Sequence, residues 1–333
     1  MNIYDISEKA GVSIATVSRV LNGNSKVSEK TRQKILKVME ENGYQPNVYA
    51  RGLGLNTMNT VGIVCADCSD EILATVVYRI EQELRKNGYD SLVCGIGYDI
   101  EVKQNYMELL LAKKVSAVFL VGSNFVEADP EKNRYIIEVA KKVPVIILNG
   151  HLEAPNVYCA YCDDEEAMRR VTMKFLQKTD KILFLNRSLS HSGRRKLEGV
   201  KQAFLLSGKE FPKEQHILFD GSIDQTKKLL MEHWEQGERW DVILTSDDDF
   251  AVAAYKFSRM AGVKVPKELQ IVGYDNSKPG ICCEPEITTI DSHIPYLGQS
   301  AVSLLMRLFQ GDKVPARLVV SGDIIVRGTT TDL

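Results

Sequence analysis

The chain has 333 residues, which is too long for one small core and suits a small domain joined to two medium lobes. Hydrophobic residues make up 44% and charged residues 26%, as in an ordinary soluble globular protein. No run reaches the roughly 18 apolar residues of a membrane span. The N-terminal residues have neither a basic nor an apolar leader region, so we expect a cytoplasmic protein.

The formal net charge of -2 conceals an asymmetry between the two ends of the chain. Residues 1–60 contain eight Lys and Arg residues against five Asp and Glu residues, so this segment is basic and the remainder is acidic. A basic head on an acidic body is expected where only the head meets a polyanion such as DNA. The seven cysteines are odd in number, which favours free thiols in a reducing compartment over a complete disulfide framework.

The N-terminal segment has the signals of a small helical domain. Its predicted helices cover residues 3–10, 14–21 and 29–42. Ser13 can cap the second helix, and Gly11 supplies a permissive turn between the first two. Two short helices joined by a tight glycine-containing turn are what a helix-turn-helix requires.

In a helix-turn-helix, the second helix enters the major groove with its N-terminal residues nearest the base edges. The predicted exposed positions of this helix are Ser13, Ile14, Ala15, Ser18 and Arg19. Arg19 is the strongest candidate for a bidentate contact to guanine, and Ile14 and Ala15 offer apolar contact to a thymine methyl group. Thr16 can reach a phosphate. The local pattern alone also fits a generic three-helix satellite domain whose arginine is solvated.

From residue 60 onward, β-rich runs alternate with runs of helical periodicity. The strand-like runs are 61–66, 91–94, 117–121, 145–148, 182–185, 216–219, 242–245 and 270–273. This alternation predicts two successive α/β lobes with parallel sheets covered on both faces, with a change of lobe near 150–163 and a return near 287–294. Two such Rossmann-like lobes bind ligands in the cleft at the carboxyl ends of their strands.

The sequence contains no evident catalytic or phosphate-binding constellation. The glycine pairs at 52–54 and 95–97 lack the third glycine of a dinucleotide fingerprint, and the histidines are scattered. We therefore expect neither an enzyme nor a bound cofactor. The motifs at 65–68 and 159–162 have the Cys-x-x-Cys spacing of a metal or redox site, but buried apolar cysteine is the commoner explanation, so we expect no metal.

A dense motif pattern covers the head: IYDISEKAGVSIATVSRVLN at 3–22, VSEKTR at 27–32, NGYQPN at 42–47 and ARGL at 50–53. With these motifs the chain resembles the LacI/GalR family of bacterial regulators. The resemblance implies a hinge helix, paired in a dimer, that lies in the minor groove with Leu53 wedged between the central base pairs. Because a short helix with Gly52 and Gly54 is marginal in water, we expect it to fold on DNA. The implied DNA contacts are Ser13, Ile14, Ala15, Thr16, Ser18, Arg19, Asn22, Asn47, Ala50 and Leu53.

The body is similar to the periplasmic-binding-protein-like sensor domain of the same family. The matching segments are 67–70, 194–199, 246–248, 272–275, 287–290 and 326–329. The implied effector contacts are Ser69, Asp70, Asn149, Arg194, Asp247 and Asp275. Carboxylates and an arginine facing one cleft suit a hydroxyl-rich ligand. Asp248 is expected to cap or support the next helix. Ile72, Leu73 and Ser222 stand where sugar sensors often place aromatic rings, which weakens the case for a plain hexose.

The resemblance implies a sequence-specific repressor that binds a palindromic operator as a homodimer and is controlled by a sugar or sugar derivative. A nucleobase or a protein partner is the alternative controlling signal. A solute-binding transport protein is opposed by the DNA-binding head. The predicted domains are a helix-turn-helix head at 1–46, a hinge at 47–59, and an effector-binding and dimerisation domain at 60–333.

Overall fold

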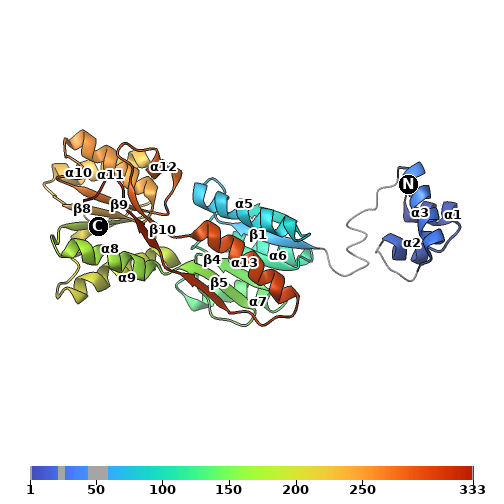
Figure 1. The fold of residues 1–333 in the computed structure, drawn as a ribbon. Helices are drawn as coiled ribbons and strands as arrows, with labels where there is room; N and C mark the ends of the chain where they lie inside the picture. Colours follow the sequence, from blue (N-terminus) through green and yellow to red (C-terminus); the bar gives the residue numbers. More distant parts are fainter. Residues whose placement is uncertain (1, 22–26, 44–58, 332) are drawn as a thin grey trace. The chain divides into compact units, whose positions relative to one another are not determined.

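The computed structural model describes residues 2–21, 27–43, 59–331 and 333. It contains two units, a helical head and an α/β body (Figure 1). Among the described residues, no helix is both long and apolar enough to cross a membrane. The predicted DNA contacts Asn22, Asn47, Ala50 and Leu53 lie outside the described residues.

The described part of the head consists of α1 (Ile3–Ala10), α2 (Ile14–Leu21) and α3 (Glu29–Glu41). The Asn2 side chain caps α1 by accepting hydrogen bonds from two backbone amides, and the Asp5 carboxylate accepts the Asn2 amide in return at 2.8 Å. Gly11 ends α1 with φ 62°, a left-handed conformation that glycine adopts without strain. The small apolar core of the head is made up of Ile6, Ala10, Val17, Val20, Ile35 and Met39.

The first lobe is built on a sheet with the strand order β11-β5-β4-β3-β1-β2. Its strands are β1 (Thr60–Cys65), β2 (Asp90–Gly95), β3 (Ala117–Val121), β4 (Val145–Leu148), β5 (Val157–Cys162) and β11 (Arg317–Val320). Its helices are α5 (Glu71–Lys86), α6 (Ile100–Ala112), α7 (Arg134–Ala140) and α13 (Ile294–Phe309), with the 3-10 turn η1 (Pro130–Asn133). Strands β1, β3, β4, β5 and β11 pair in parallel, and α5 and α13 share an apolar core with them.

The second lobe is built on a sheet with the order β12-β10-β9-β8-β6-β7. Its strands are β6 (Ile182–Asn186), β7 (His216–Leu218), β8 (Val242–Thr245), β9 (Gln270–Tyr274), β10 (Thr288–Asp291) and β12 (Asp323–Ile325). Its helices are α8 (Asp164–Leu176), α9 (His191–Leu206), α10 (Ile223–Glu235), α11 (Asp248–Ala261) and α12 (Lys278–Ile281), with the 3-10 turn η2 (Lys213–Gln215). One apolar cluster joins α8 and α9 to the sheet and another joins α10 and α11 to it, so helices cover both faces (Figure 1).

The chain passes from one sheet to the other three times within the described body, after β5, after β10 and after β11. Because β3, β4 and β8 are buried at every residue, they appear in the sequence as continuous apolar runs, which is the signature of a strand covered on both faces. Among the strand pairings that the structure describes in the second lobe, β12 pairs antiparallel with β10, and the others are parallel. The predicted fold, a helix-turn-helix head and a body of two Rossmann-like lobes, is confirmed.

Candidate functional site

The exposed face of α2 is the candidate DNA interface of the head. Val17 and Val20 are buried in the head core, whereas Ile14, Ala15 and Arg19 are exposed to solvent. This division is that of an amphipathic helix, which leaves one face of α2 open to a partner. The predicted contacts Ile14, Ala15 and Arg19 therefore lie on an available surface, and their contact with DNA stays a prediction.

The N-terminal end of α2 is stabilised by two of the predicted DNA contacts. The Thr16 amide donates to the Ser13 hydroxyl at 3.2 Å, and the hydroxyl groups of Ser13 and Thr16 lie 2.9 Å apart. A serine in this position satisfies one of the amides at the helix start that lack a helical partner. Ser13 thus has a structural role in addition to its predicted contact, and Ser18 is half-buried.

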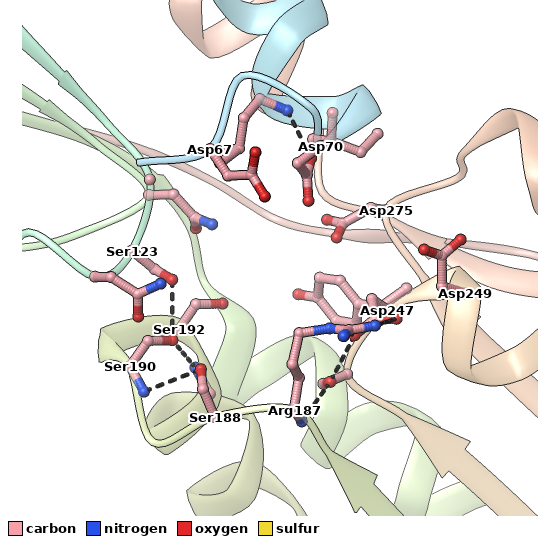
Figure 2. Close-up of a pocket in the computed structure, with 18 of the residues that line it drawn as sticks. Asp67, Asp70, Ser123, Arg187, Ser188, Ser190, Ser192, Asp247, Asp249 and Asp275 are labelled. Carbon is pink, nitrogen blue, oxygen red and sulfur yellow. Dashed lines mark hydrogen bonds and ion pairs between the residues drawn. The ribbon is translucent and has the colours of Figure 1, made fainter. Parts of the chain in front are cut away.

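The body contains a cleft of about 470 Å³ that is lined from both lobes (Figure 2). In the first lobe it is lined by segments that follow β1, β3 and β4, and in the second lobe by segments that follow β6, β8 and β9. These are the carboxyl ends of parallel strands, where open α/β sheets place their ligand sites. The volume falls within the range of about 300–1,000 Å³ that is typical of small-molecule pockets.

Most of the predicted effector contacts lie in this cleft, namely Ser69, Asp70, Asn149, Asp247 and Asp275. Asp70 caps α5 by accepting the Leu73 amide at 2.9 Å, and Asp247 caps α11 by accepting the Phe250 amide at 3.0 Å. Asp247 is therefore the cap of this helix, and Asp248, predicted to cap or support it, lies in its first turn and accepts hydrogen bonds from Ser277 and Thr289. The carboxylates of Asp70 and Asp247 are both held in place by a helix start, which fixes their orientation toward the cleft. Their contact with an effector stays a prediction.

Arg194 is absent from the residues that line the cleft, and its contact with an effector stays a prediction. Its side chain is half-buried, and Nη1 donates to the Leu189 carbonyl oxygen at 2.6 Å. Lys196, two positions further along α9, lines the cleft instead and is buried. Residues two apart on an α-helix point about 200° apart, so Arg194 and Lys196 face opposite directions. The Lys196 ammonium donates to the Ser246 carbonyl oxygen at 2.7 Å and lies 3.5 Å from the centroid of the Tyr274 ring.

Arg187 is a major cleft residue that the sequence reasoning missed. Its guanidinium forms a bidentate pair with Asp247, with Nε to Oδ2 at 2.9 Å and Nη2 to Oδ1 at 3.0 Å. Nη1 donates to the Gly221 carbonyl oxygen at 3.1 Å, and the guanidinium lies 4.0 Å from the centroid of the Phe250 ring. Arg187 directly follows the buried strand β6, and this position at a strand end is the signal that could have identified it.

Two carboxyl groups at the floor of the cleft have raised pKa values. Burial raises the pKa of Asp248 to about 6, against the hydrogen bonds that it accepts from Ser277 and Thr289. Burial also raises the pKa of Asp275 to about 7, with Lys196 acting in the opposite direction. Asp275 accepts a hydrogen bond from the Ser292 hydroxyl at 2.7 Å. At neutral pH, Asp275 is therefore partly protonated and able to donate as well as accept hydrogen bonds.

Asn149 and Asp275 both have left-handed backbone conformations, with φ values of 61° and 90°. Such conformations cost free energy in residues other than glycine and occur preferentially at functional sites. Both residues stand directly after a buried strand, β4 or β9, and both line the cleft. The strain is consistent with side chains aimed at a ligand.

The residues expected beside the effector in place of aromatic rings do not all line the cleft, and one aromatic ring lines it that was not expected. Ile72 and Leu73 line the cleft, as their predicted place beside the effector implies. Ser222 instead caps α10 and is outside the lining residues, whereas Tyr98 supplies an exposed ring that the sequence reasoning did not consider. Burial raises the pKa of the Tyr98 hydroxyl, and Asp67 adds to the effect, so this hydroxyl stays protonated.

The cysteine pairs are mainly buried thiols. Burial raises the pKa of Cys65 and Cys162 to about 12 and that of Cys159 to about 11, so these thiols are protonated at neutral pH. A thiolate is the form that binds metals and reacts with oxidants. In the part of the chain that the structure describes, no three His, Cys, Asp or Glu residues are grouped to hold a metal ion.

Two family descriptions match the chain. Residues 2–47 match the bacterial regulatory proteins of the lacI family, and residues 58–325 match the periplasmic binding proteins and sugar binding domain of the LacI family. Together these matches cover the head and most of the body.

Individual relatives match over nearly the whole chain. An HTH-type transcriptional regulator of Lachnoclostridium phytofermentans is 49% identical over 333 residues, covering 99% of each chain. The catabolite control protein A of Priestia megaterium is 28% identical and covers 96% of each chain. Among solved structures, a lac repressor dimer bound to operator and the anti-inducer ONPF matches with a TM-score of 0.85 and 26% identity, covering 99% of this chain and 98% of that one.

Proposed function

Because the chain belongs to the LacI family of bacterial transcriptional regulators, we propose that it represses transcription as a homodimer bound to a palindromic operator, under the control of a small molecule in the cleft. The observation that carries this proposal is the polar cleft between the carboxyl edges of two sheets, present in the same chain as a helix-turn-helix with an exposed recognition face. Neither a transport protein nor a metabolic enzyme needs a helix-turn-helix with an exposed recognition face.

In this proposal, residues 1–46 form the DNA-binding head, residues 47–59 form the hinge, and residues 60–333 bind the effector and dimerise. Arg19 contacts a guanine in the major groove while Ile14 and Ala15 contact thymine methyl groups. Asn22, Asn47 and Ala50 add contacts to the operator, and Leu53 inserts into the minor groove. Each operator half-site is occupied by one head, because a two-fold symmetric dimer reads a palindrome.

The effector in this proposal is rich in hydroxyl groups. The cleft contributes carboxylates and small polar side chains such as Ser69, Ser123 and Asn149, which can pair with hydroxyl groups when water leaves. Effector binding rotates one lobe relative to the other, which the three chain crossings permit, and this changes the separation of the two hinge segments in the dimer. DNA affinity and effector affinity are then coupled reciprocally.

An operator titration tests the proposal. A duplex selected from a random palindromic library is titrated with the wild type, with Arg19→Ala, and with Arg134→Ala as a control, whose side chain is 76% exposed on the body. Arg19→Ala should lose about 1–3 kcal/mol of preference for the selected duplex over random DNA, while the control should match the wild type. An unchanged preference in Arg19→Ala would refute a role for α2 in DNA recognition. A protein that is monomeric at concentrations that saturate the operator would refute the proposed dimer.

A further inference from the structure

The cleft carries far more carboxyl groups than cations. In the first lobe it is lined by Asp67, Asp70 and Glu71. In the second lobe it is lined by Asp220, Asp247, Asp248, Asp249 and Asp275. Arg187 and Lys196 are the cationic residues among the described lining residues. Even with Asp248 and Asp275 counted as neutral, the carboxylates outnumber the cations, so the potential in the cleft is negative.

Both cations are already engaged by the protein. Arg187 holds Asp247 through two hydrogen bonds, donates to Gly221, and lies within 3.4 Å of an Asp220 oxygen. Lys196 donates to the Ser246 carbonyl oxygen and lies over the Tyr274 ring. An anionic ligand would therefore have to displace an internal partner to find a cation, which leaves a carboxylate or a carbonyl group without its donor.

Carboxyl groups of the two lobes face each other across the cleft. Figure 2 shows Asp67 and Asp70 on the first lobe opposite Asp247, Asp249 and Asp275. Burial raises the pKa of Asp70, and the Asp247 charge adds to that increase. Burial likewise raises the pKa of Asp249, with Asp247 and Asp70 adding to the increase and Arg187 acting in the opposite direction. Carboxylates of the two lobes thus raise each other's pKa at this place, and a further positive charge between them would relieve that repulsion.

We propose that the effector carries a protonated primary amine alongside its hydroxyl groups, as an amino sugar does, and that this ammonium group binds between Asp70 of the first lobe and Asp249 of the second. The inference rests on the proposed function and names the chemical class of its effector. The ammonium group joins the lobes by removing their repulsion, which makes it the part of the ligand that drives closure.

The chemistry of the lining favours a primary amine over other cations. A primary ammonium has three N–H donors that carboxylate oxygens can accept, whereas a quaternary ammonium requires a cage of aromatic faces. Tyr98 is an exposed ring at the cleft, and the Tyr274 ring is covered by Lys196. Among the described residues, no three His, Cys, Asp or Glu side chains of the cleft are grouped to hold a metal ion.

The test compares sugars that differ mainly in charge. Glucosamine and its β-1,4-linked dimer are titrated calorimetrically against full-length protein, beside glucose, N-acetylglucosamine and glucuronate with their corresponding dimers. The amines should bind at least about tenfold more tightly than the neutral sugars, and the difference should shrink as ionic strength rises. Glucuronate should bind most weakly of all. Equal or tighter binding of neutral or anionic sugars, or no binding of either amine, would overturn the inference.

Two variants locate the ammonium group. Asp70→Asn keeps a residue that caps α5, and Asp249→Asn changes a carboxylate exposed in the first turn of α11, so both should fold. Each should weaken amine binding about tenfold and weaken the affinity for glucose by a clearly smaller factor, while the exposed Glu210→Gln control should match the wild type. Unchanged amine binding in both variants would refute the assigned position. The proposed function has a separate readout, because the operator preference lost in Arg19→Ala is measured without any sugar.

Discussion

The ion pair between Arg187 and Asp247 should make a measurable contribution to the stability of the second lobe. The pair has bidentate geometry, and the Arg187 and Asp247 side chains are 34% and 21% exposed. Breaking a fully buried pair costs about 3–5 kcal/mol, whereas exposed pairs contribute about 0–1 kcal/mol. We therefore expect Arg187→Met to lower the free energy of unfolding by about 2 kcal/mol, because Asp247 then lacks a cation in a partly dry site.

A double-mutant cycle isolates the pair. Asp247→Asn should destabilise the protein by about 1–2 kcal/mol, and the double variant should be less destabilised than the sum of the two single variants by about 1.5 kcal/mol. Arg307 and Asp312 provide a matched control, because their 3.2 Å pair is 57% and 48% exposed on the surface. The same cycle there should give a coupling energy below about 0.5 kcal/mol.

The assay is urea unfolding followed by tryptophan fluorescence. Both tryptophans of the chain, Trp234 and Trp240, pack against the apolar cluster of the second lobe that contains Phe250, so the signal reports on the lobe that holds the pair. Protein concentration is held constant because the proposed dimerisation would link stability to concentration. Effects of the two single variants that add within about 0.3–0.5 kcal/mol would refute a coupled pair and leave Asp247 as a helix cap alone.

Three further variants probe other features of the body. Burial raises the pKa of Asp275 from 3.8 to about 7, so the folded chain retains a proton that the unfolded chain releases between those values. The free energy of unfolding should therefore fall by about 3–4 kcal/mol as pH rises from about 4 to about 7, and Asp275→Asn should lack that component; parallel pH profiles would contradict this. A Cβ atom at Gly199 would lie 2.2 Å from the Glu165 carbonyl oxygen, so Gly199→Ala should separate α8 from α9 and lower the urea midpoint, at a cost of about 1–3 kcal/mol. Lys103→Met leaves Glu127 without the buried ammonium that lies 2.8 Å away, so it should lower the free energy of unfolding by about 3 kcal/mol in the same assay. A urea midpoint equal to that of the wild type would contradict this.

Continuous apolar runs were enough to predict the strands that are buried along their whole length, whereas β5, β10, β11 and β12 were not among the predicted strands. The predicted strands at 117–121, 145–148 and 242–245 have the observed bounds of β3, β4 and β8, each of which is buried along its whole length. Edge strands were less sharply defined. The run predicted at 216–219 ends one residue earlier as β7, whose residues are half-buried or exposed, so its sequence carries a weaker apolar signal.

The predicted effector contacts that line the cleft follow strands, whereas Arg194, on a helix, is absent from the lining. Asp70, Asn149, Asp247 and Asp275 all stand within a few residues of a strand end, and all line the cleft. Arg194 was placed there through resemblance along a helix, where a displacement of two residues reverses the direction of the side chain. Its replacement by Lys196 could not be derived without knowing which face of α9 packs on the sheet.

The negative charge of the cleft could not be predicted from the sequence, because the totals of acidic and basic residues do not reveal it. The chain has 42 Lys and Arg residues against 44 Asp and Glu residues, which gives no hint of a strongly acidic site. The acidic residues of the cleft come from separate places between 67 and 275, and only the convergence of strand ends brings them together. The cations that balance them in the sequence lie largely on outer surfaces, as in the exposed pairs of Arg85, Lys141 and Arg307. A fold that places strand ends from both lobes in one cleft thus creates a local field from a nearly neutral chain, and this field restricts which ligand charge can close the lobes.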